Sequence, residues 1–355
     1  MKAIVLCAGA GMRLRPLTFS TPKHLIPVAN KPVLFYCIES LVAAGARQIA
    51  LVVSPDSREL IREAVGDGHR WSAQVAYVEQ ATPHGLAHAV QCAQSFVGTD
   101  PFIMYLGDTL IPEGLVGAVD LFSRSGANAV VAVKGVDDPS RCGIVALDGD
   151  RIVRLVEKPA QPISNLAIAG AYVFDHHIFE SIEHIRPSSR NEYEITDAIQ
   201  HLIDRGLSAV PYVLHGWWQD TGQPRDLLAA NRVMLQGLAP AVHGSVDAAS
   251  TTEGAVWVGT GAIVIGSHIR GPTIIGAQAH IVDSDIGPFT SIGDRVQIAG
   301  TRVENSIVMD DCVIRQLRRP LVNSLLGRRV QVTGALTEAD SIELLLGDCC
   351  EARLP

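Results

Sequence analysis

The chain has 355 residues, 47% of them hydrophobic, which is enough for one large or two medium-sized domains. Its net charge of −8 and its scattered lysines and arginines exclude the basic stripe that nucleic-acid binding requires. The seven cysteines form no Cys-x-x-Cys pair, and neither a leader segment nor an 18-residue apolar run occurs, so we expect a cytoplasmic protein without disulfides, structural zinc or a membrane anchor.

The first predicted element is a strand over Lys2–Cys7, which runs directly into the glycine turn Gly9-Ala10-Gly11. Outward-pointing N–H groups at such a turn favour an anion, and Arg13 and Lys23 just beyond it suit a polyphosphate. The turn matches neither a Walker loop, which needs a Gly-Lys pair, nor a dinucleotide fingerprint, because Leu14 occupies the third glycine position. The alternatives are a nucleoside triphosphate site, which the cations favour, and a plain glycine turn.

The longer stretch LCAGAGMRLRPLT, followed by PKHLIPVANKP, resembles the signature of the sugar-1-phosphate nucleotidylyltransferases. Within that family it is most similar to the glucose-1-phosphate thymidylyltransferases of the long form, which carry an added C-terminal domain. The resemblance extends to about Gly237. It implies nucleotide contacts at Leu6, Ala8, Gly9 and Gly11, with Ala8 replacing a glycine that many members carry.

Helices and strands are predicted to alternate between residues 32 and 134. The expected helices are Pro32–Ala44, Ser57–Val65 and Gly85–Phe96, and the expected strands are Gln48–Ser54, Gln74–Glu79, Phe102–Leu106 and Asn128–Lys134. This alternation is typical of an α/β fold with a Rossmann-like, mainly parallel sheet. Gly9, Gln80 and Asp108 each follow a strand, so we expect them to converge at the carboxyl edge of the sheet.

Residues 80–89, QATPHGLAHA, are the candidate base pocket. The amide of Gln80 can donate and accept at once, as pairing with a pyrimidine imide requires, and Gly85 opens a helix without a β-carbon. The resemblance assigns Gln80, Pro83 and Gly85 to this pocket. His84 and His88 stand where the family commonly has an acid and an amide, and each is interpreted as a solvated helix residue.

Asp108, in YLGD, and Asp220, in WWQD, form the candidate metal pair. Mg²⁺ takes one or two carboxylates with phosphates and water, and two converging carboxylates without a cation would repel one another. Each aspartate alone is equally compatible with a turn or a helix cap. The resemblance places both at metal-binding positions, and Trp218 is a candidate wall of a sugar pocket.

Glu157 and Lys158 end a strand-like run over 151–156. A carboxylate accepts hydrogen bonds from sugar hydroxyls and an ammonium holds a phosphate, although Glu-Lys-Pro alone is typical of an exposed turn. The resemblance assigns both to the sugar phosphate, together with Gly143 and Ile168. Cys142 replaces a tyrosine common in the family.

One clear helix is predicted in the middle section, from Ile195 to Ile203 and stopped by Gly206. It follows the segment RNEYEITD, residues 190–197, which resembles a family segment with Asn191 in place of glycine. Glu194 either frames the sugar site or belongs to a helix-capping cluster.

A further helix over 224–237 precedes a shift in composition to Ala, Ser, Gly, His and Pro. Apolar residues then recur six apart (275, 281; 286, 292, 298; 307, 313), which is typical of a hexapeptide β-helix. We expect a nucleotidyltransferase domain at 1–238, a linker at 239–252 and a left-handed β-helix with a tail at 253–355. Such repeats commonly serve assembly, so a homo-oligomer is expected.

The predicted activity is transfer of a nucleotidyl group from dTTP to glucose 1-phosphate, giving dTDP-glucose and pyrophosphate, with Mg²⁺ as the cofactor. Arg13, Lys23 and Asp108 are the expected catalytic residues, and neither nucleic acid nor a membrane is an expected partner. One alternative is UTP or another hexose 1-phosphate as substrate. Others are added acetyl transfer in the β-helix, with His268 or His280 as base, and a non-catalytic nucleotide-sugar sensor.

Overall fold

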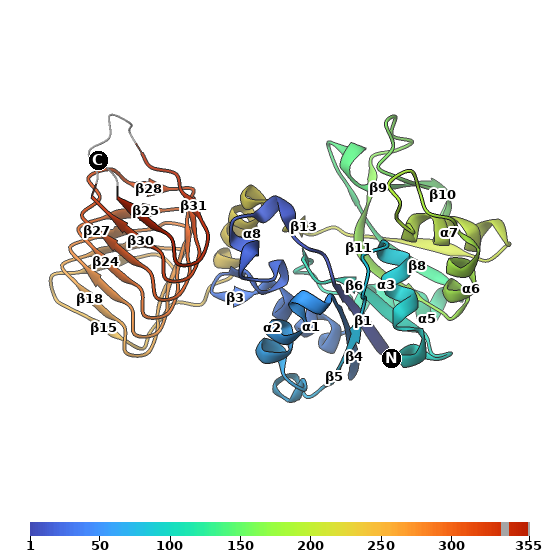
Figure 1. Cartoon of the computed structure of the whole chain (residues 1–355), viewed down its shortest axis with the longest axis horizontal. Coiled ribbons are helices and arrows are strands. Elements are labelled where there is room, and N and C mark those ends of the chain that lie inside the picture. Colours follow the sequence, from blue (N-terminus) through green and yellow to red (C-terminus); the bar gives the residue numbers. More distant parts are fainter. Residues whose placement is uncertain (335–340, 354–355) are drawn as a thin grey trace. The chain divides into compact units, whose positions relative to one another are not determined.

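The computed structural model describes residues 1–334 and 341–353 (Figure 1). The chain divides into two compact units. The first combines Met1–Gly9 with Val33–Asp220, and the second combines Ala10–Pro32 with Thr221–Pro355. Among the described residues, none of the helices combines the length and the apolar character that crossing a membrane would need.

The first unit is built around a nine-stranded sheet in the order β10-β9-β11-β6-β1-β4-β5, with β8 beside β11 and β12 beside β8. The strands are β1 (Lys2–Cys7), β4 (Gln48–Val53), β5 (Gln74–Glu79), β6 (Phe102–Leu106), β8 (Ala129–Gly135), β9 (Gly143–Asp148), β10 (Arg151–Glu157), β11 (Leu166–Phe174) and β12 (Ala209–Val213). The neighbours β6, β1, β4 and β5 are parallel, whereas β11 is antiparallel to β6, β8 and β9. The expected Rossmann-like sheet is confirmed, and β11 makes it mixed.

Seven α-helices accompany the sheet in the described part of this unit: α1 (Val33–Ala43), α2 (Pro55–Val65), α3 (Leu86–Cys92), α4 (Gln94–Val97), α5 (Val116–Ser125), α6 (His177–His184) and α7 (Ile195–Asp204). Two one-turn 3₁₀ helices lie at His69–Trp71 and Pro139–Arg141. Buried apolar residues of α3, α6 and α7 pack with those of the sheet in one core. The helix expected over 85–96 is interrupted at Ala93, and α5 and α6 were not expected from the sequence.

Parallel register brings the carboxyl ends of β6, β1, β4 and β5 to one edge of the sheet. Cys7 is paired with Val53, and Val53 in turn with Glu79, so the residues after β1, β4 and β5 leave the sheet together. After β6, the Gly107 N–H donates to the Leu6 carbonyl at 3.0 Å. The expected convergence of the segments after β1, β5 and β6 at this edge is therefore present.

The second unit contains a left-handed β-helix whose short strands stack coil on coil in three parallel sheets (Figure 1). The first sheet holds β14 (Ala241–Val242), β17 (Val256–Val258), β20 (Thr273–Ile275), β23 (Thr290–Ile292), β26 (Ile307–Val308), β29 (Leu325–Leu326) and β31 (Leu345–Leu346). The second holds β15 (Ser245–Val246), β18 (Ile263–Ile265), β21 (His280–Val282), β24 (Gln297–Ala299), β27 (Val313–Arg315), β30 (Gln331–Thr333) and β32 (Glu351–Arg353). The third holds β16 (Thr251–Glu253), β19 (His268–Arg270), β22 (Asp285–Ile286), β25 (Arg302–Glu304) and β28 (Leu321–Val322).

The same unit includes α8 (Pro224–Gln236) and the segment 10–32. That segment contains one-turn 3₁₀ helices at Met12–Leu14, Leu17–Phe19 and Lys23–Leu25, and the two-stranded ribbon β2 (Pro27–Val28) and β3 (Lys31–Pro32). Residues 239–252, for which a linker is expected, hold β14, β15 and the start of β16. These strands pair with β17, β18 and β19 and so form the first coil.

The six-residue phase predicted for the β-helix is wrong after Ile298. Val308 and Ile314, rather than residues 307 and 313, align with Ile292 and Ile298 of the preceding coil. The cause is a shorter coil: Ile275 to Ile292 spans 17 residues, but Ile292 to Val308 spans 16. A fixed period does not anticipate this change, nor the next coil, in which Val308 to Leu326 spans 18 residues.

Candidate functional site

The base-pocket segment begins where β5 ends. The Gln80 N–H donates to the Val53 carbonyl at 2.9 Å, and its side chain is 4% exposed. Gln80 Nε2 donates to the Gly85 carbonyl at 3.1 Å and lies 3.0 Å from His88 Nδ1. Both amide hydrogens are thus engaged within the protein. His88, expected as a solvated helix residue, is instead half-buried and holds the amide, and burial lowers the pKa of its imidazole.

Gly85 is required by the backbone of a distant segment. It is the residue before α3, with φ +104°, and a β-carbon there would lie 2.6 Å from the Tyr193 carbonyl oxygen and 2.7 Å from the Tyr193 nitrogen. The Tyr193 N–H donates to the His84 carbonyl at 2.7 Å, and the Tyr193 carbonyl accepts from the Ala87 N–H at 3.0 Å. The expected opening of a helix at Gly85 is present, and Pro83 lies exposed just before it.

The two aspartates of the candidate metal pair lie on one ribbon. β7 (Thr109–Leu110) pairs antiparallel with β13 (Gln219–Asp220), and Asp220 faces Thr109 directly. Asp108, which precedes Thr109, is only 8% exposed. The ribbon therefore brings two carboxylates from distant parts of the chain to one end of β7. Two oxygen donors of this kind are the ligands that Mg²⁺ accepts from protein.

The residues before Asp220 are tied to the sheet. Lys134 Nζ donates to the carbonyls of Leu214, His215 and Gly216 at 3.2, 3.1 and 2.8 Å. Trp218 Nε1 donates to the Ala169 carbonyl on β11 at 2.9 Å. These bonds fix the path of the chain into β13, and they place the Trp218 indole against the strand that carries Ile168.

Three of the predicted sugar residues, Gly143, Glu157 and Ile168, lie on the neighbouring strands β9, β10 and β11. Gly143 pairs with Glu157 across β9 and β10, and Ile144 pairs with Ala167 of β11. A β-carbon on Gly143 would lie 2.9 Å from Glu157 Oε2 and 3.1 Å from Ile168 Cδ1. Only glycine leaves these side chains where they are. Lys158, which follows Glu157, has its Nζ 3.5 Å from Glu157 Oε1.

Charges around Glu157 come from three sides. Burial is the largest effect and raises the pKa of its carboxyl, although Lys158 and Arg190 lower that pKa and Glu194 raises it further. Arg190 Nη2 lies 3.4 Å from Glu157 Oε1 and 2.7 Å from Glu194 Oε1. Glu194 precedes α7, but its side chain makes no capping bond and instead accepts from Ser188 Oγ at 2.7 Å. The Glu194 side chain is therefore not a helix cap, and its framing of a sugar site stays a prediction.

Two residues near Glu157 were not predicted from the sequence. Arg190 links Glu157 to Glu194, and the only signal for it is its place in the charged segment 190–197. Thr196 Cγ2 is 3.0 Å from the position of a β-carbon on Gly143, and Thr196 Oγ1 is buried without a hydrogen-bond partner among the described residues. No sequence signal distinguishes this threonine from other helix-start threonines.

The predicted cations Arg13 and Lys23 lie on the segment 10–32 of the second unit. Gly11, in left-handed conformation at φ +63°, precedes the 3₁₀ turn that carries Arg13. Thr18 Oγ1 donates to the Gly11 carbonyl at 2.8 Å and folds the segment back on itself. Arg13 is exposed and Lys23 is half-buried.

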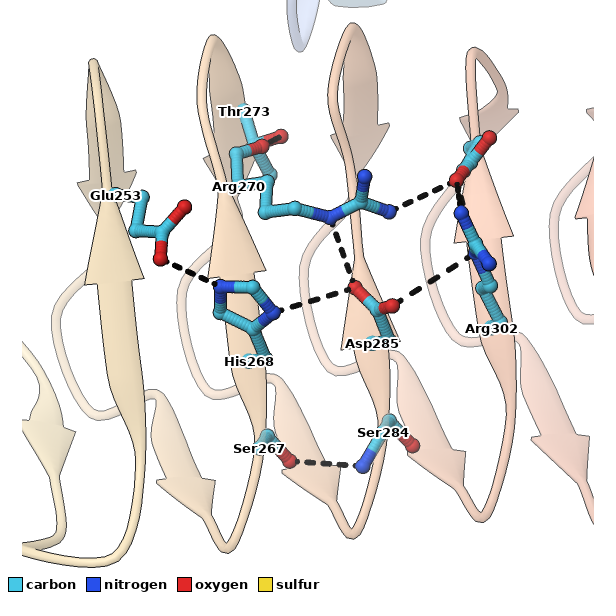
Figure 2. Close-up of polar contacts among 9 residues, drawn as sticks. Glu253, Ser267, His268, Arg270, Thr273, Ser284, Asp285 and Arg302 are labelled. Carbon is cyan, nitrogen blue, oxygen red and sulfur yellow. Dashed lines mark hydrogen bonds and ion pairs between the residues drawn. The ribbon is translucent and has the colours of Figure 1, made fainter.

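A second polar cluster lies on the third sheet of the β-helix (Figure 2). His268 Nε2 is 3.3 Å from Glu253 Oε1, and His268 Nδ1 is 3.9 Å from Asp285 Oδ1. Asp285 accepts from Arg270 Nε at 3.1 Å, and Arg302 Nε lies 3.7 Å from its other oxygen. His268 therefore has acidic neighbours, which sequence reasoning did not find, but two arginines already engage the carboxylate of Asp285.

The chain is similar to known proteins both in sequence and in fold. A family model described as Nucleotidyl transferase matches residues 2–237. The glucose-1-phosphate thymidylyltransferase of Streptomyces antibioticus is 46% identical over 351 residues, which is 98% of each chain. That of Streptomyces griseus is 42% identical over 355 residues, covering 100% of this chain and 99% of the relative. A solved UDP-glucose pyrophosphorylase complexed with UDP-glucose is similar, with a TM-score of 0.60 and 27% identity over 66% of this chain and 98% of that one.

Proposed function

Since the chain belongs to the nucleotidyl transferase family, we propose that it transfers the thymidylyl group of dTTP to glucose 1-phosphate and releases pyrophosphate. Similarity over the whole length to glucose-1-phosphate thymidylyltransferases supports this choice of substrates. The observation that carries it is the packing of Gly143, Glu157 and Ile168, a compact acceptor for a sugar, in the unit that also holds the metal pair and Gln80.

Gln80 is proposed to select the base. Both hydrogens of its amide are engaged with Gly85 and His88, so the contact runs through the amide oxygen. That oxygen accepts from the ring N–H of a pyrimidine dione, a donor that thymine and uracil have and cytosine lacks. Gln80 therefore supports dTTP or UTP over CTP, and it does not separate the first two.

Asp108 and Asp220 are proposed to hold Mg²⁺. The β7–β13 ribbon brings their two carboxylates together, and this pair fits Mg²⁺. A third protein ligand is not needed, because Mg²⁺ takes its other ligands from phosphates and water. When bound, Mg²⁺ neutralises charge on the phosphates of the triphosphate.

In the proposed reaction, a phosphate oxygen of glucose 1-phosphate attacks the α-phosphorus of dTTP, and the bond from that phosphorus to the bridging oxygen of the β-phosphate breaks. Because the nucleophile is already an anion, no general base is needed, and positioning and charge neutralisation dominate catalysis. We assign Arg13 to the leaving pyrophosphate and Lys23 to the α-phosphate region. Glu157 accepts from sugar hydroxyls, and Lys158 holds the phosphate of the sugar.

The test is pyrophosphate release from dTTP and glucose 1-phosphate by purified variants. Lys23→Ala and Asp108→Asn are each expected to lower kcat by ~10²–10³, the usual loss when one preorganised charge-stabilising contact is removed. Asp150→Asn, an exposed aspartate in the turn between β9 and β10, is the matched control and should keep full activity. Near-normal turnover of either variant, with folding intact by circular dichroism, would refute these assignments.

Substrate choice is tested by running the same assay with UTP and with other hexose 1-phosphates, and we expect dTTP and glucose 1-phosphate to have the highest kcat/KM. We further propose a homo-oligomer that works in the cytoplasm. The stacked repeats of the second unit and the seven free cysteines support this proposal. Size-exclusion chromatography with light scattering measures the mass of the oligomer directly.

Acyl transfer in the β-helix is the second candidate, because His268 lies beside Glu253 (Figure 2). The support is weaker, since the Asp285 carboxylate is engaged by Arg270 and Arg302 and the Glu253 side chain is 68% exposed. His280 is exposed on β21, beside Ile263 and Gln297 in the neighbouring coils. Thiol release from acetyl-CoA distinguishes the candidates, and we expect none.

A further inference from the structure

The segment 10–32 has little structure of its own. Its three 3₁₀ helices are one turn each, and none of them has a side-chain capping bond. The hydrogen-bond geometry of a 3₁₀ turn is poorer than that of an α-helix. Since this segment carries Arg13 and Lys23, whatever holds it also sets where these two cations lie.

One support comes from the last described coils of the β-helix. Asp348 Oδ1 accepts from the Arg328 N–H of the preceding coil at 2.7 Å, while Oδ2 accepts from Ser20 Oγ at 2.7 Å and from Thr21 Oγ1 at 3.3 Å. A single carboxylate thus joins two coils and the stretch between Arg13 and Lys23. Thr21 is 3% exposed, so its hydroxyl is held away from water.

Two other described aspartates link successive coils but form no hydrogen bond with the segment 10–32. Asp294 Oδ1 accepts from the Ala277 N–H at 2.7 Å, and Asp310 Oδ1 accepts from the Asp294 N–H at 3.0 Å. Both therefore link one coil to the next, as Asp348 does. Among these three described coil aspartates, only Asp348 also accepts from the segment 10–32.

A second support holds the far end of the segment. Asn231 on α8 is fully buried, and its Oδ1 accepts from the Ala29 N–H at 2.8 Å and from Ser291 Oγ at 2.7 Å. Its Nδ2 donates to the Phe289 carbonyl at 3.1 Å. Asn30 Nδ2 adds a bond to the Ile292 carbonyl at 2.6 Å. The β-helix and α8 thus form hydrogen bonds with the segment on both sides of Lys23.

We propose that Asp348 of the β-helix is a positioning residue, which acts through Ser20 and Thr21 on the segment that carries Arg13 and Lys23. The proposal rests on the function proposed above. Without the Asp348 contact, the segment spends less time in its competent arrangement, and apparent affinity falls in proportion to that population. The deficit should appear in KM for dTTP, because saturating nucleotide draws the segment back.

The experiment compares Asp348→Ala, Ser20→Ala and Asp294→Ala in the full-length chain. Ser20→Ala removes the shorter of the two bonds from the segment to Asp348 without touching a coil, and Asp294→Ala removes a coil link without touching the segment. We expect KM for dTTP to rise about 5-fold in the first two variants, the factor given by a hydrogen bond of ordinary strength, with kcat nearly unchanged. Asp348→Asn, whose amide can still bond both hydroxyls, should restore most of the affinity.

Deuterium exchange of the amides at 18–26 gives a readout that does not depend on activity. It should accelerate in Asp348→Ala and Ser20→Ala and stay at the wild-type rate in Asp294→Ala. Unchanged exchange in Ser20→Ala overturns the contact, and faster exchange with an unchanged KM for dTTP overturns its link to the substrate. Failure of the wild-type chain to release pyrophosphate from dTTP and glucose 1-phosphate would instead refute the function proposed above, so the two failures are distinguishable.

Discussion

Replacing Glu157 by glutamine separates function from stability at the proposed sugar site. The substitution keeps the size and one acceptor oxygen of the side chain but removes its charge. Glu157 faces Gly143 across the β9–β10 pair and lies beside Lys158 and Arg190. Arg190 keeps its shorter bond to Glu194, at 2.7 Å, so the neighbouring helix start should stay in place.

The expected loss of activity in Glu157→Gln follows from the strength of hydrogen bonds to a charged carboxylate. Hydrogen bonds to a charged group contribute roughly 1.5–3 kcal/mol, which corresponds to a factor of about 10–150 in kcat/KM. We expect kcat/KM for glucose 1-phosphate to fall within this range in Glu157→Gln. KM for dTTP should change by less than about twofold, since the lost interaction is with the sugar substrate.

Stability should change in the opposite direction. Burial raises the pKa of the Glu157 carboxyl, so folding favours its protonated form. The contribution of this group to stability is complete below its unfolded pKa, near 4.5, and is lost as the pH rises through the raised folded pKa. At pH 7.5 the charged carboxylate therefore destabilises the fold, and Glu157→Gln should melt no lower than the wild type.

The matched control is Glu192→Gln. Glu192 also lies near Arg190, at 3.5 Å, but its side chain is 45% exposed. It should leave kcat/KM for glucose 1-phosphate within about twofold of the wild type, because exposed ion pairs contribute little. Steady-state kinetics and calorimetry on both variants decide the matter. An unchanged kcat/KM for glucose 1-phosphate in Glu157→Gln, or an equal loss in Glu192→Gln, would show that Glu157 does not contact the sugar.

Two further predictions concern the base pocket. Gly85→Ala should lower the melting temperature by about 5 °C, equivalent to ~2 kcal/mol, because its β-carbon would overlap the Tyr193 backbone. The control is Gly126→Ala, where φ is positive but no atom lies within 4 Å of the added β-carbon, and it should lower the melting temperature about half as much. Equal shifts by calorimetry would show that Tyr193 is not the reason for glycine at position 85. Burial lowers the pKa of His88, so near neutral pH the imidazole is uncharged and its Nδ1 accepts from Gln80 Nε2. As the pH falls through this lowered pKa, the imidazole gains a proton and the bond is lost, so KM for dTTP should rise about threefold more in the wild type than in His88→Asn. Parallel pH profiles of the two proteins would contradict this.

The helices and strands whose bounds were predicted correctly are those that neighbouring residues in the sequence determine. β5 and β6 have the predicted bounds, and α7 and α8 begin at the predicted residues. Each has an apolar pattern, and β6, α7 and α8 are also followed by a glycine. The direction of β11 is not local information. Leu166–Phe174 is apolar almost throughout, and such a run pairs equally well in either direction until its neighbours are known.

At the candidate site too, the sequence predicts the residues but not the contacts between distant segments. The resemblance supplied Glu157 and Gly143, and the structure adds why glycine is needed at 143, since the reason is a side chain on the paired strand. Gly85 was explained from the sequence by the approach of a base. In the structure, the backbone of Tyr193, more than a hundred positions further along the chain, already occupies that space. Contacts of this kind become visible only once the two segments are folded together.

The first unit places negative charge where the polyanionic substrates are proposed to bind. Burial raises the pKa of the Cys142 thiol, and the carboxylates of Asp220 and Glu157 raise it further. Burial likewise raises the pKa of the Cys37 thiol, with an added contribution from Asp108. Two like unit charges 4 Å apart repel by about 4 kcal/mol at a protein surface. Cations must offset this repulsion before a triphosphate and a sugar phosphate can meet.

A divalent ion on the aspartate pair offsets part of it, and the remainder falls to side chains. Of the proposed phosphate ligands, Arg13 and Lys23 lie on the segment 10–32, whose own turns are too short to hold a fixed shape. Electrostatic stabilisation requires charges that are in place before the reaction, since reorganising them during it raises the barrier. The contacts from Asp348 and Asn231 hold that segment, so the proposed positions of Arg13 and Lys23 depend on the second unit.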